Sequence, residues 1–172
     1  MTNKITFIIG GARSGKSEYA LKLASKAKNV AFIATAQALD GEMANRIKLH
    51  KKARPKNWRT FEEPVKVSSL LKNIPSGYDM VIIDCLTLLV SNLLLKKIHA
   101  GAIEKEAASM VNELNRRRGK AIVVSNEVGL GIVPGNKLSR DFRDIAGRVN
   151  GIVAEKSDRV VFMVSGIPWR IR

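Results

Sequence analysis

With 172 residues, 45% of them hydrophobic, the chain is long enough for one domain spanning residues 1–172 with a buried core. Its single cysteine excludes an internal disulfide and a cysteine-rich metal site, as is typical of a protein in the reducing cytoplasm. The longest apolar passage, residues 81–95, is interrupted by Asp84 and Asn92 and is too short to span a bilayer. The first predicted strand starts close to the N-terminus, so we also expect no signal peptide.

The formal net charge of +15 has two interpretations. It indicates either a polyanionic partner such as RNA or a protein whose surface lysines bind triphosphates. Aromatic residues, on which bases stack, make up only 5% of the chain, and the basic residues are spread over several segments. The composition therefore disfavours a nucleic-acid partner.

A phosphate-binding loop follows the first predicted strand. Residues 5–9 are a short apolar, β-branched run, and apolar residues recur at helical spacing from Ser17 onward. Between them the sequence satisfies the pattern G-x-x-x-x-G-K-[ST] at every fixed position. In such a loop backbone N–H groups hold a phosphate, Lys16 reaches the β- and γ-phosphates, and the Ser17 hydroxyl can bind Mg²⁺. The loop consists of Gly10, Gly11, Ala12, Arg13, Ser14, Gly15, Lys16 and Ser17.

The rest of the chain alternates predicted strands and helices. This order predicts an α/β, P-loop NTPase-type three-layer domain with a mostly parallel central sheet flanked by helices. Strands are expected at 5–9, 30–34, 58–62, 80–84, 121–125 and 160–164, with a short edge at 168–171. Helices are expected from 17 onward and at 40–54, 64–71, 86–98, 103–118 and 138–153.

Three local features sharpen these expectations. Asp40 can cap the helix that Pro55 stops, and Pro64 fits as the first residue of the next helix. His99 is expected at the end of a helix, where an imidazole favours the helix dipole. The glycine-rich segment 126–134 follows a strand, and sheets of this class place substrate-contacting residues there.

Asp84 ends an apolar strand, in an arrangement that resembles a Walker B motif. A carboxylate at the end of a strand beside a phosphate loop can hold Mg²⁺ directly or through water. A strand that ends in an aspartate is common on its own, so the metal role depends on the phosphate loop being present. With that loop, the predicted metal residues are Ser17 and Asp84.

His50 is one of two histidines and lies on a predicted helix. It shares a helical stripe with Met43, Ile47 and Arg54, because steps of three and four residues return to the same face. This placement fits a half-buried structural histidine as well as a nucleophile. The basic residues around it could hold a triphosphate or form an ordinary solvated face.

Several motifs together resemble those of the bifunctional adenosylcobinamide kinase / adenosylcobinamide-phosphate guanylyltransferases of cobalamin biosynthesis. In chain order they are GGARSGKS at 10–17, IATA at 33–36, EM at 42–43 with RI at 46–47 and His50, RP at 54–55 with WRT at 58–60, SNEVG at 125–129 and FRDIAGRVN at 142–150. The resemblance extends from the first strand to residues 164–166. Its consistent order and spacing make it far more specific than the phosphate loop alone.

The resemblance implies two reactions on a corrinoid. In the first, the hydroxyl of the aminopropanol arm of adenosylcobinamide takes the γ-phosphoryl group of ATP or GTP. In the second, GMP passes from GTP to that phosphate through a covalent adduct on His50, which gives adenosylcobinamide-GDP and pyrophosphate. A neutral imidazole suits this step, since it is a good nucleophile near pH 7 and its phosphoramidate is reactive. The resemblance also implies a homo-oligomer, with a trimer expected.

The same resemblance implies which residues contact the guanine nucleotide. Beyond the phosphate loop they are Ala34, Thr35, Ala36, Lys51, Lys52, Ala53, Arg54, Glu62 and Asp84. A carboxylate such as Glu62 can accept hydrogen bonds from the N–H groups of guanine, although a surface acid beside Glu63 is an equal interpretation. One departure is Gly135 before Asn136, where the family usually places an acid.

Two alternative functions stay open at this point. They are a small-molecule or nucleoside kinase without the histidine step, and a nucleic-acid-binding ATPase.

Overall fold

The computed structural model describes residues 4–172, apart from the side chain of Arg46. Within them one seven-stranded sheet has the order β3-β2-β4-β5-β1-β6-β7, in which every neighbouring pair is parallel except β6 and β7. The strands are β1 Ile5–Gly10, β2 Val30–Ala34, β3 Arg59–Glu62, β4 Met80–Asp84, β5 Lys120–Asn126, β6 Arg159–Val164 and β7 Ile167–Arg170. The predicted α/β fold with a mostly parallel sheet is confirmed.

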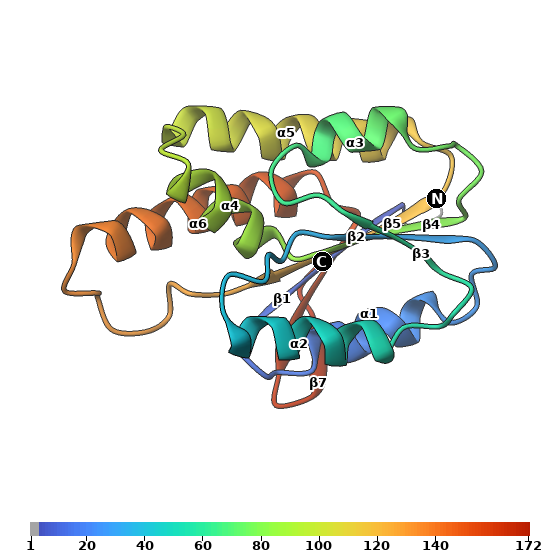
Figure 1. Cartoon of the computed structure of the whole chain (residues 1–172), viewed down its shortest axis with the longest axis horizontal. Coiled ribbons are helices and arrows are strands. Elements are labelled where there is room, and N and C mark those ends of the chain that lie inside the picture. Colours follow the sequence, from blue (N-terminus) through green and yellow to red (C-terminus); the bar gives the residue numbers. More distant parts are fainter. Residues whose placement is uncertain (1–3) are drawn as a thin grey trace.

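Helices cover both faces of the sheet and complete three layers (Figure 1). Figure 1 shows α1 and α2 below the sheet and α3, α4, α5 and α6 above it. Their bounds are α1 Lys16–Ala24, α2 Gly41–Lys52, α3 Val67–Asn73, α4 Leu86–Leu95, α5 Ala100–Arg116 and α6 Lys137–Glu155. Within residues 4–172, no helix combines the length and apolar character that a membrane span requires.

Two apolar cores lie on the two faces of the sheet. Successive residues of β1 alternate between them, so that Phe7 packs with the core under α3–α6 while Ile8 packs with the core over α1. Ile83 and Ile82 of β4 divide in the same way. Strands buried on both faces are apolar at nearly every position, which explains the long apolar runs in the sequence.

Two local predictions about helix ends are wrong. Pro64 does not open a helix, because α3 begins at Val67. The Glu63 carboxylate instead accepts N–H bonds from Val65 at 3.0 Å and Lys66 at 2.8 Å, which holds a turn before the helix. His99 is the N-cap of α5, where its Nδ1 accepts from the Ala102 N–H at 3.2 Å. An acceptor nitrogen at a helix N-terminus satisfies an unpaired N–H group, which is the reverse of the expected role.

The parallel strands bring the candidate site together at one edge of the sheet. β1, β2, β3, β4 and β5 end there at Gly10, Ala34, Glu62, Asp84 and Asn126, respectively. Gly10 is paired with Asn126, and Ala34 is paired with both Glu62 and Asp84. Ligands of open α/β sheets bind outside the carboxyl ends of the strands, so this edge is where a ligand is expected.

Candidate functional site

The phosphate loop connects β1 directly to α1. Gly15 caps the helix with φ +89°, a conformation that glycine adopts without a steric penalty. The turn between β6 and β7 supports the loop from outside, since the Gly166 N–H donates to the Ser14 carbonyl at 3.1 Å. The predicted strand, loop and helix are therefore all present in order.

Lys16 is folded into the phosphate loop and is only 8% exposed. Its Nζ donates to the Gly11 carbonyl and lies 3.4 Å from the Ser14 hydroxyl. The ammonium group therefore lies within the ring of backbone that the loop forms. A phosphate bound here would meet both this charge and the N-terminus of α1.

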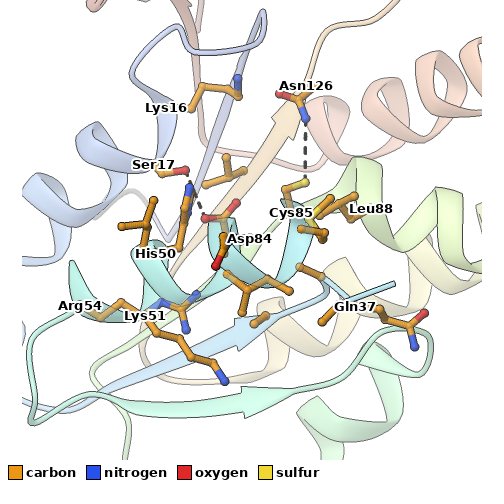
Figure 2. A pocket seen from close by; sticks show the side chains of 18 of the residues that line it. Lys16, Ser17, Gln37, His50, Lys51, Arg54, Asp84, Cys85, Leu88 and Asn126 are labelled. Carbon is orange, nitrogen blue, oxygen red and sulfur yellow. Dashed lines mark hydrogen bonds between the residues drawn. The ribbon is translucent and has the colours of Figure 1, made fainter. Parts of the chain in front are cut away.

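Asp84 lies beside Ser17, with Oδ2 3.2 Å from the Ser17 hydroxyl (Figure 2). Burial raises the pKa of this carboxyl, and His50, the Ser17 hydrogen bond, Arg54 and Lys16 each act in the opposite direction. A half-buried carboxylate next to a hydroxyl offers the oxygen ligands that Mg²⁺ prefers. The residues present therefore fit a magnesium ion at this position, and its other ligands would be phosphate oxygens and water.

A cleft of about 1070 Å³ opens at this edge of the sheet. Its walls come from the phosphate loop, the ends of β2, β3, β4 and β5, and one face of α2 (Figure 2). The predicted site residues that line it are Arg13, Ser14, Gly15, Lys16, Ser17, Ala34, Ala36, His50, Lys51, Arg54, Glu62 and Asp84. Its volume is ample for a nucleoside triphosphate, because drug-sized ligands occupy clefts of roughly 300–1,000 Å³.

Helix α2 presents the predicted stripe to this cleft. Asp40 caps the helix by accepting from the Met43 N–H at 2.7 Å, as expected. Met43, Ile47, His50 and Arg54 all line the cleft, so the face that these residues share is the one that looks toward Asp84. Figure 2 shows the His50 ring directed from α2 toward Ser17 and Asp84. His50 is half-buried. It forms part of the wall of the cleft and belongs to neither apolar core.

Arg54 and Lys51 add positive charge to the same wall. The guanidinium carbon of Arg54 lies 3.7 Å from the centre of the Phe32 ring, a cation–π geometry. Burial lowers the pKa of Arg54, while Asp84 and Glu62 act to raise it. Lys51 forms an ion pair with Glu62 across the cleft, from α2 to the end of β3. Glu62 is thus held at the cleft, whereas its neighbour Glu63 belongs to the turn before α3.

Other predicted contact residues lie away from the cleft. Thr35 is fully buried, and its hydroxyl donates to the Cys85 carbonyl at 2.7 Å and accepts from the Cys85 N–H at 2.9 Å. Lys52 and Ala53 are exposed at the end of α2, outside the lining of the cleft. Gly10, Gly11 and Ala12 form the first half of the phosphate loop and also do not line it. The side chain of Arg46, in the basic segment, lies outside the described residues.

The structure adds lining residues that the sequence did not single out. They include Gln37, which follows the end of β2, and Leu88, on the first turn of α4. Both positions follow a strand of the parallel sheet, so the rule that ligands bind at strand ends could have found them. Cys85 also lines the cleft, but burial raises the pKa of its thiol to about 11, so it stays protonated at neutral pH.

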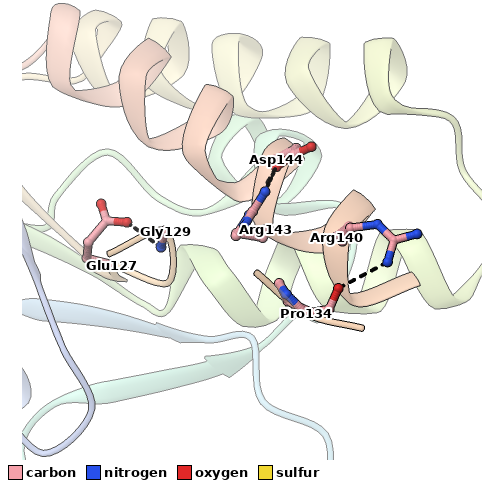
Figure 3. Close-up of polar contacts among 6 residues, drawn as sticks. All are labelled: Glu127, Gly129, Pro134, Arg140, Arg143 and Asp144. Carbon is pink, nitrogen blue, oxygen red and sulfur yellow. Dashed lines mark hydrogen bonds and ion pairs between the residues drawn. The ribbon is translucent and has the colours of Figure 1, made fainter. Parts of the chain in front are cut away.

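The charged face of α6 makes contacts within the chain. Arg143 pairs with the adjacent Asp144 at 3.1 Å (Figure 3), and Arg148 reaches Glu104 of α5 at 2.6 Å. Asn136, next to the departure at Gly135, caps α6 by accepting from the Ser139 N–H at 2.8 Å. These residues lie outside the lining of the cleft, so they add no charge to it.

Comparison with known proteins agrees with this geometry. Residues 6–171 match the family model of cobinamide kinase / cobinamide phosphate guanyltransferase. The chain belongs to this family.

Bifunctional adenosylcobalamin biosynthesis proteins are among the relatives. CobP of Pseudomonas aeruginosa is 43% identical over 166 residues, which are 96% of this chain and 95% of the relative. CobU of Salmonella typhimurium is 41% identical over 177 residues, covering 96% of this chain and 98% of the relative. The fold is also similar to that of a KaiC-like protein from Pyrococcus horikoshii, with a TM-score of 0.55 and 16% identity over 92% of this chain and 70% of that chain.

Proposed function

We propose that this chain carries out both reactions for which its family is named, using one phosphate loop. The observation that carries the proposal is that His50, Lys16, Ser17 and Asp84 all line one cleft in a member of this family. A phosphate loop alone supports many nucleotide-dependent reactions. A histidine facing the same cleft supplies a nucleophile for a second transfer.

In the kinase step, the hydroxyl of the aminopropanol arm of adenosylcobinamide attacks the γ-phosphorus of ATP or GTP. The bond from the γ-phosphorus to the bridging oxygen breaks, the nucleoside diphosphate leaves, and the hydroxyl proton is released. Lys16 lies where it can stabilise the negative charge on the transferring phosphoryl group. When bound at Ser17 and Asp84, Mg²⁺ would neutralise charge on the phosphate oxygens.

In the guanylyltransferase step, a nitrogen of His50 attacks the α-phosphorus of GTP and pyrophosphate leaves. The phosphate oxygen of adenosylcobinamide phosphate then attacks the same phosphorus, which frees His50 and gives adenosylcobinamide-GDP. The cations that line this wall, Lys51 and Arg54, favour the charge that develops on the phosphate oxygens.

Glu62 is the proposed selector for guanine. Its carboxylate can accept hydrogen bonds from the ring N–H and the exocyclic amine of guanine, two donors that adenine does not present together. The ion pair with Lys51 holds it at the cleft. Ala34 and Ala36 flank the end of β2 there and leave room for the nucleotide. Thr35, in contrast, would act by fixing the backbone of Cys85 rather than by touching the nucleotide.

We further propose that the enzyme works in the cytoplasm as a homo-oligomer, with a trimer expected. Ile167 and Trp169 of the edge strand β7 are 68% and 63% exposed, so an apolar surface is open for a second copy. Light scattering coupled to size-exclusion chromatography measures the oligomeric state directly. A monomeric mass at micromolar concentration would contradict this part of the proposal.

Product analysis tests the proposed function. The enzyme is incubated with adenosylcobinamide and GTP, with and without ATP, and the corrinoids are separated and weighed by mass spectrometry. The expected products are adenosylcobinamide phosphate followed by adenosylcobinamide-GDP, with one pyrophosphate released per GDP-linked product. Nucleotide hydrolysis without any modified corrinoid would contradict the proposal.

A further inference from the structure

A second cavity, of about 330 Å³, is lined in part by α4 and α6, which lie on the face of the sheet opposite to α2 (Figure 1). It adjoins the large cleft, since Leu88 and Asn126 line both. Its remaining walls come from the phosphate loop, α4, the segment after β5 and α6, through Ala12, Thr87, Ser91, Glu127, Val128 and Phe142. A molecule in this cavity would therefore lie next to the phosphate tail of a nucleotide held by the loop.

Of the described residues that line this cavity, only Glu127 is titratable. It directly follows β5, and its N–H donates to the Gly10 carbonyl at 3.0 Å, so its backbone abuts the start of the phosphate loop. Its Oε1 accepts from the Gly129 N–H at 2.7 Å (Figure 3). A Cβ at position 129 would lie 3.0 Å from this oxygen, so glycine there permits the close approach.

The segment that follows Glu127 is also fixed at its far end. Arg140 of α6 donates from Nη1 to the Pro134 carbonyl at 3.0 Å (Figure 3) and to the Gly135 carbonyl at 2.7 Å. The segment 127–135 is therefore held by hydrogen bonds at both ends. A carboxylate in such a setting has a defined position relative to the phosphate loop, as proton transfer requires.

The two cavities differ in charge. Cations such as Lys16, Lys51 and Arg54 line the large cleft together with several carboxylates, whereas no lysine or arginine of the described residues lines the small cavity. Thr87, Ser91 and Asn126 provide uncharged hydrogen-bonding groups, and Val128 and Phe142 provide apolar surface. This lining suits a neutral aliphatic arm that carries a hydroxyl group, and it is unsuited to a triphosphate.

We propose that the small cavity binds the hydroxyl-bearing arm of the acceptor during the kinase step and that Glu127 is the general base of that step. This inference rests on the proposed kinase function. The Glu127 carboxylate takes the hydroxyl proton as the oxygen forms its bond to the γ-phosphorus. The bond to the bridging oxygen breaks, the nucleoside diphosphate leaves with those electrons, and Glu127 then gives its proton to solvent. The guanylyl step needs no such base, because its acceptor is an already ionised phosphate.

The test measures the two half-reactions separately in Glu127→Gln. This variant keeps an oxygen that can accept from the Gly129 N–H, so it removes the base and preserves the segment. With ATP and adenosylcobinamide, kcat of the kinase step is expected to fall on the order of 10²-fold or more. With GTP and adenosylcobinamide phosphate, guanylyl transfer is expected to stay within about threefold of wild type. Glu127→Asp is expected to recover part of the kinase rate.

Matched variants control for general damage. Glu155→Gln changes an exposed glutamate at the C-terminal end of α6, about 20 Å along the helix from Phe142, and should leave both rates unchanged. Ser91→Phe fills the cavity without altering Glu127, and it should raise KM for adenosylcobinamide in the kinase step at least tenfold while KM for ATP stays constant.

The outcomes separate this inference from the proposed function. A kinase rate near wild type in Glu127→Gln, or an equal loss of both half-reactions with an unchanged circular dichroism spectrum, would overturn the role of Glu127. An unchanged KM for adenosylcobinamide in Ser91→Phe would overturn the binding role of the cavity. If the wild-type enzyme forms no phosphorylated corrinoid, the proposed kinase function itself fails.

Discussion

The two flanks of the phosphate loop carry opposite kinds of side chain. On the α2 flank, His50 lies in a wall with Lys51 and Arg54, and Glu62 is paired with one of those cations. On the β5–α6 flank, Glu127 is the one titratable group within the described part of the chain that lines the small cavity, and its other lining residues are uncharged. The first environment suits a nucleophile that attacks a charged α-phosphate, and the second suits a base that activates a neutral hydroxyl.

This difference explains how one phosphate loop can serve two reactions. A triphosphate held by Lys16 has an α-phosphate and a γ-phosphate at different positions along its length. A nucleophile on one flank and a base on the other can each address one of them. The predictions below perturb first the shared centre of the site and then its flanks, from the largest expected effect to the smallest.

Lys16 belongs to the shared centre, so its loss should stop both reactions. We expect Lys16→Ala to lower both the kinase and the guanylyltransferase rates on the order of 10³-fold, because the charge that faces the phosphates is removed. Steady-state assays of each half-reaction measure this effect. Lys22→Ala, an exposed lysine on the same helix, should leave both rates unchanged. Loss of only one reaction would show that the loop does not serve both.

We expect both reactions to depend on a magnesium ion held by Asp84. Asp84→Asn keeps the shape of the side chain but removes the charge expected to hold the metal, so both rates should fall on the order of 10²-fold. The Mg²⁺ concentration at half-maximal rate should rise as well. Titration of each half-reaction with MgCl₂ measures both quantities, with Asp141→Asn on α6 as a surface control. An unchanged Mg²⁺ requirement would contradict the proposed metal site.

Glu62 should affect nucleotide selectivity only in the guanylyltransferase reaction, which we assign to the α2 flank. We expect Glu62→Gln to reduce the preference for GTP over ATP in covalent labelling of the enzyme by about tenfold, since one guanine contact is weakened in an exposed position. Lys51→Met breaks the same ion pair but keeps the carboxylate, so it should retain more of the preference. If both variants select GTP as strongly as wild type, Glu62 does not read the base.

Thr35 should matter for stability more than for binding. Its buried hydroxyl makes two hydrogen bonds to the backbone of Cys85, so Thr35→Val leaves two buried polar groups without that partner. We expect a loss of about 1–3 kcal/mol in the free energy of unfolding, measured by urea denaturation. Thr60→Val on the exposed strand β3 should change stability by less than about 0.5 kcal/mol. An equal effect of the two substitutions would refute this assignment.

The centre of the site could be predicted from sequence because its pattern is local. The apolar runs that became β1 and β4, and the loop between β1 and α1, each lie within a few consecutive residues. The parallel order of the strands then brings Asp84 next to Ser17 without further information. Helical spacing predicts that His50 and Arg54 share a face, although only the packed structure shows that this face looks into the cleft and that Arg54 lies just beyond the end of α2.

The remaining features depend on contacts between distant parts of the chain. Thr35 follows directly after β2, where strand alternation no longer indicates which way a side chain points. Its side chain is oriented by the hydrogen bond from its hydroxyl to the Cys85 carbonyl, which the sequence does not reveal. His99 lies between the predicted helices 86–98 and 103–118, and local sequence does not show that it opens the second helix rather than closing the first. The Glu127 cavity requires α4, α6 and the phosphate loop to meet, and no local pattern encodes that meeting.

The central claim is that the two flanks perform separable reactions, and His50→Ala tests it most directly. The variant is incubated with adenosylcobinamide, ATP and GTP labelled in its α-phosphate, and the corrinoid products and the protein-bound label are measured together. The account predicts that adenosylcobinamide phosphate accumulates at close to the wild-type rate, with no GDP-linked product and no acid-labile label on the protein. Formation of adenosylcobinamide-GDP at the wild-type rate, or equal loss of both products in a folded protein, would contradict it.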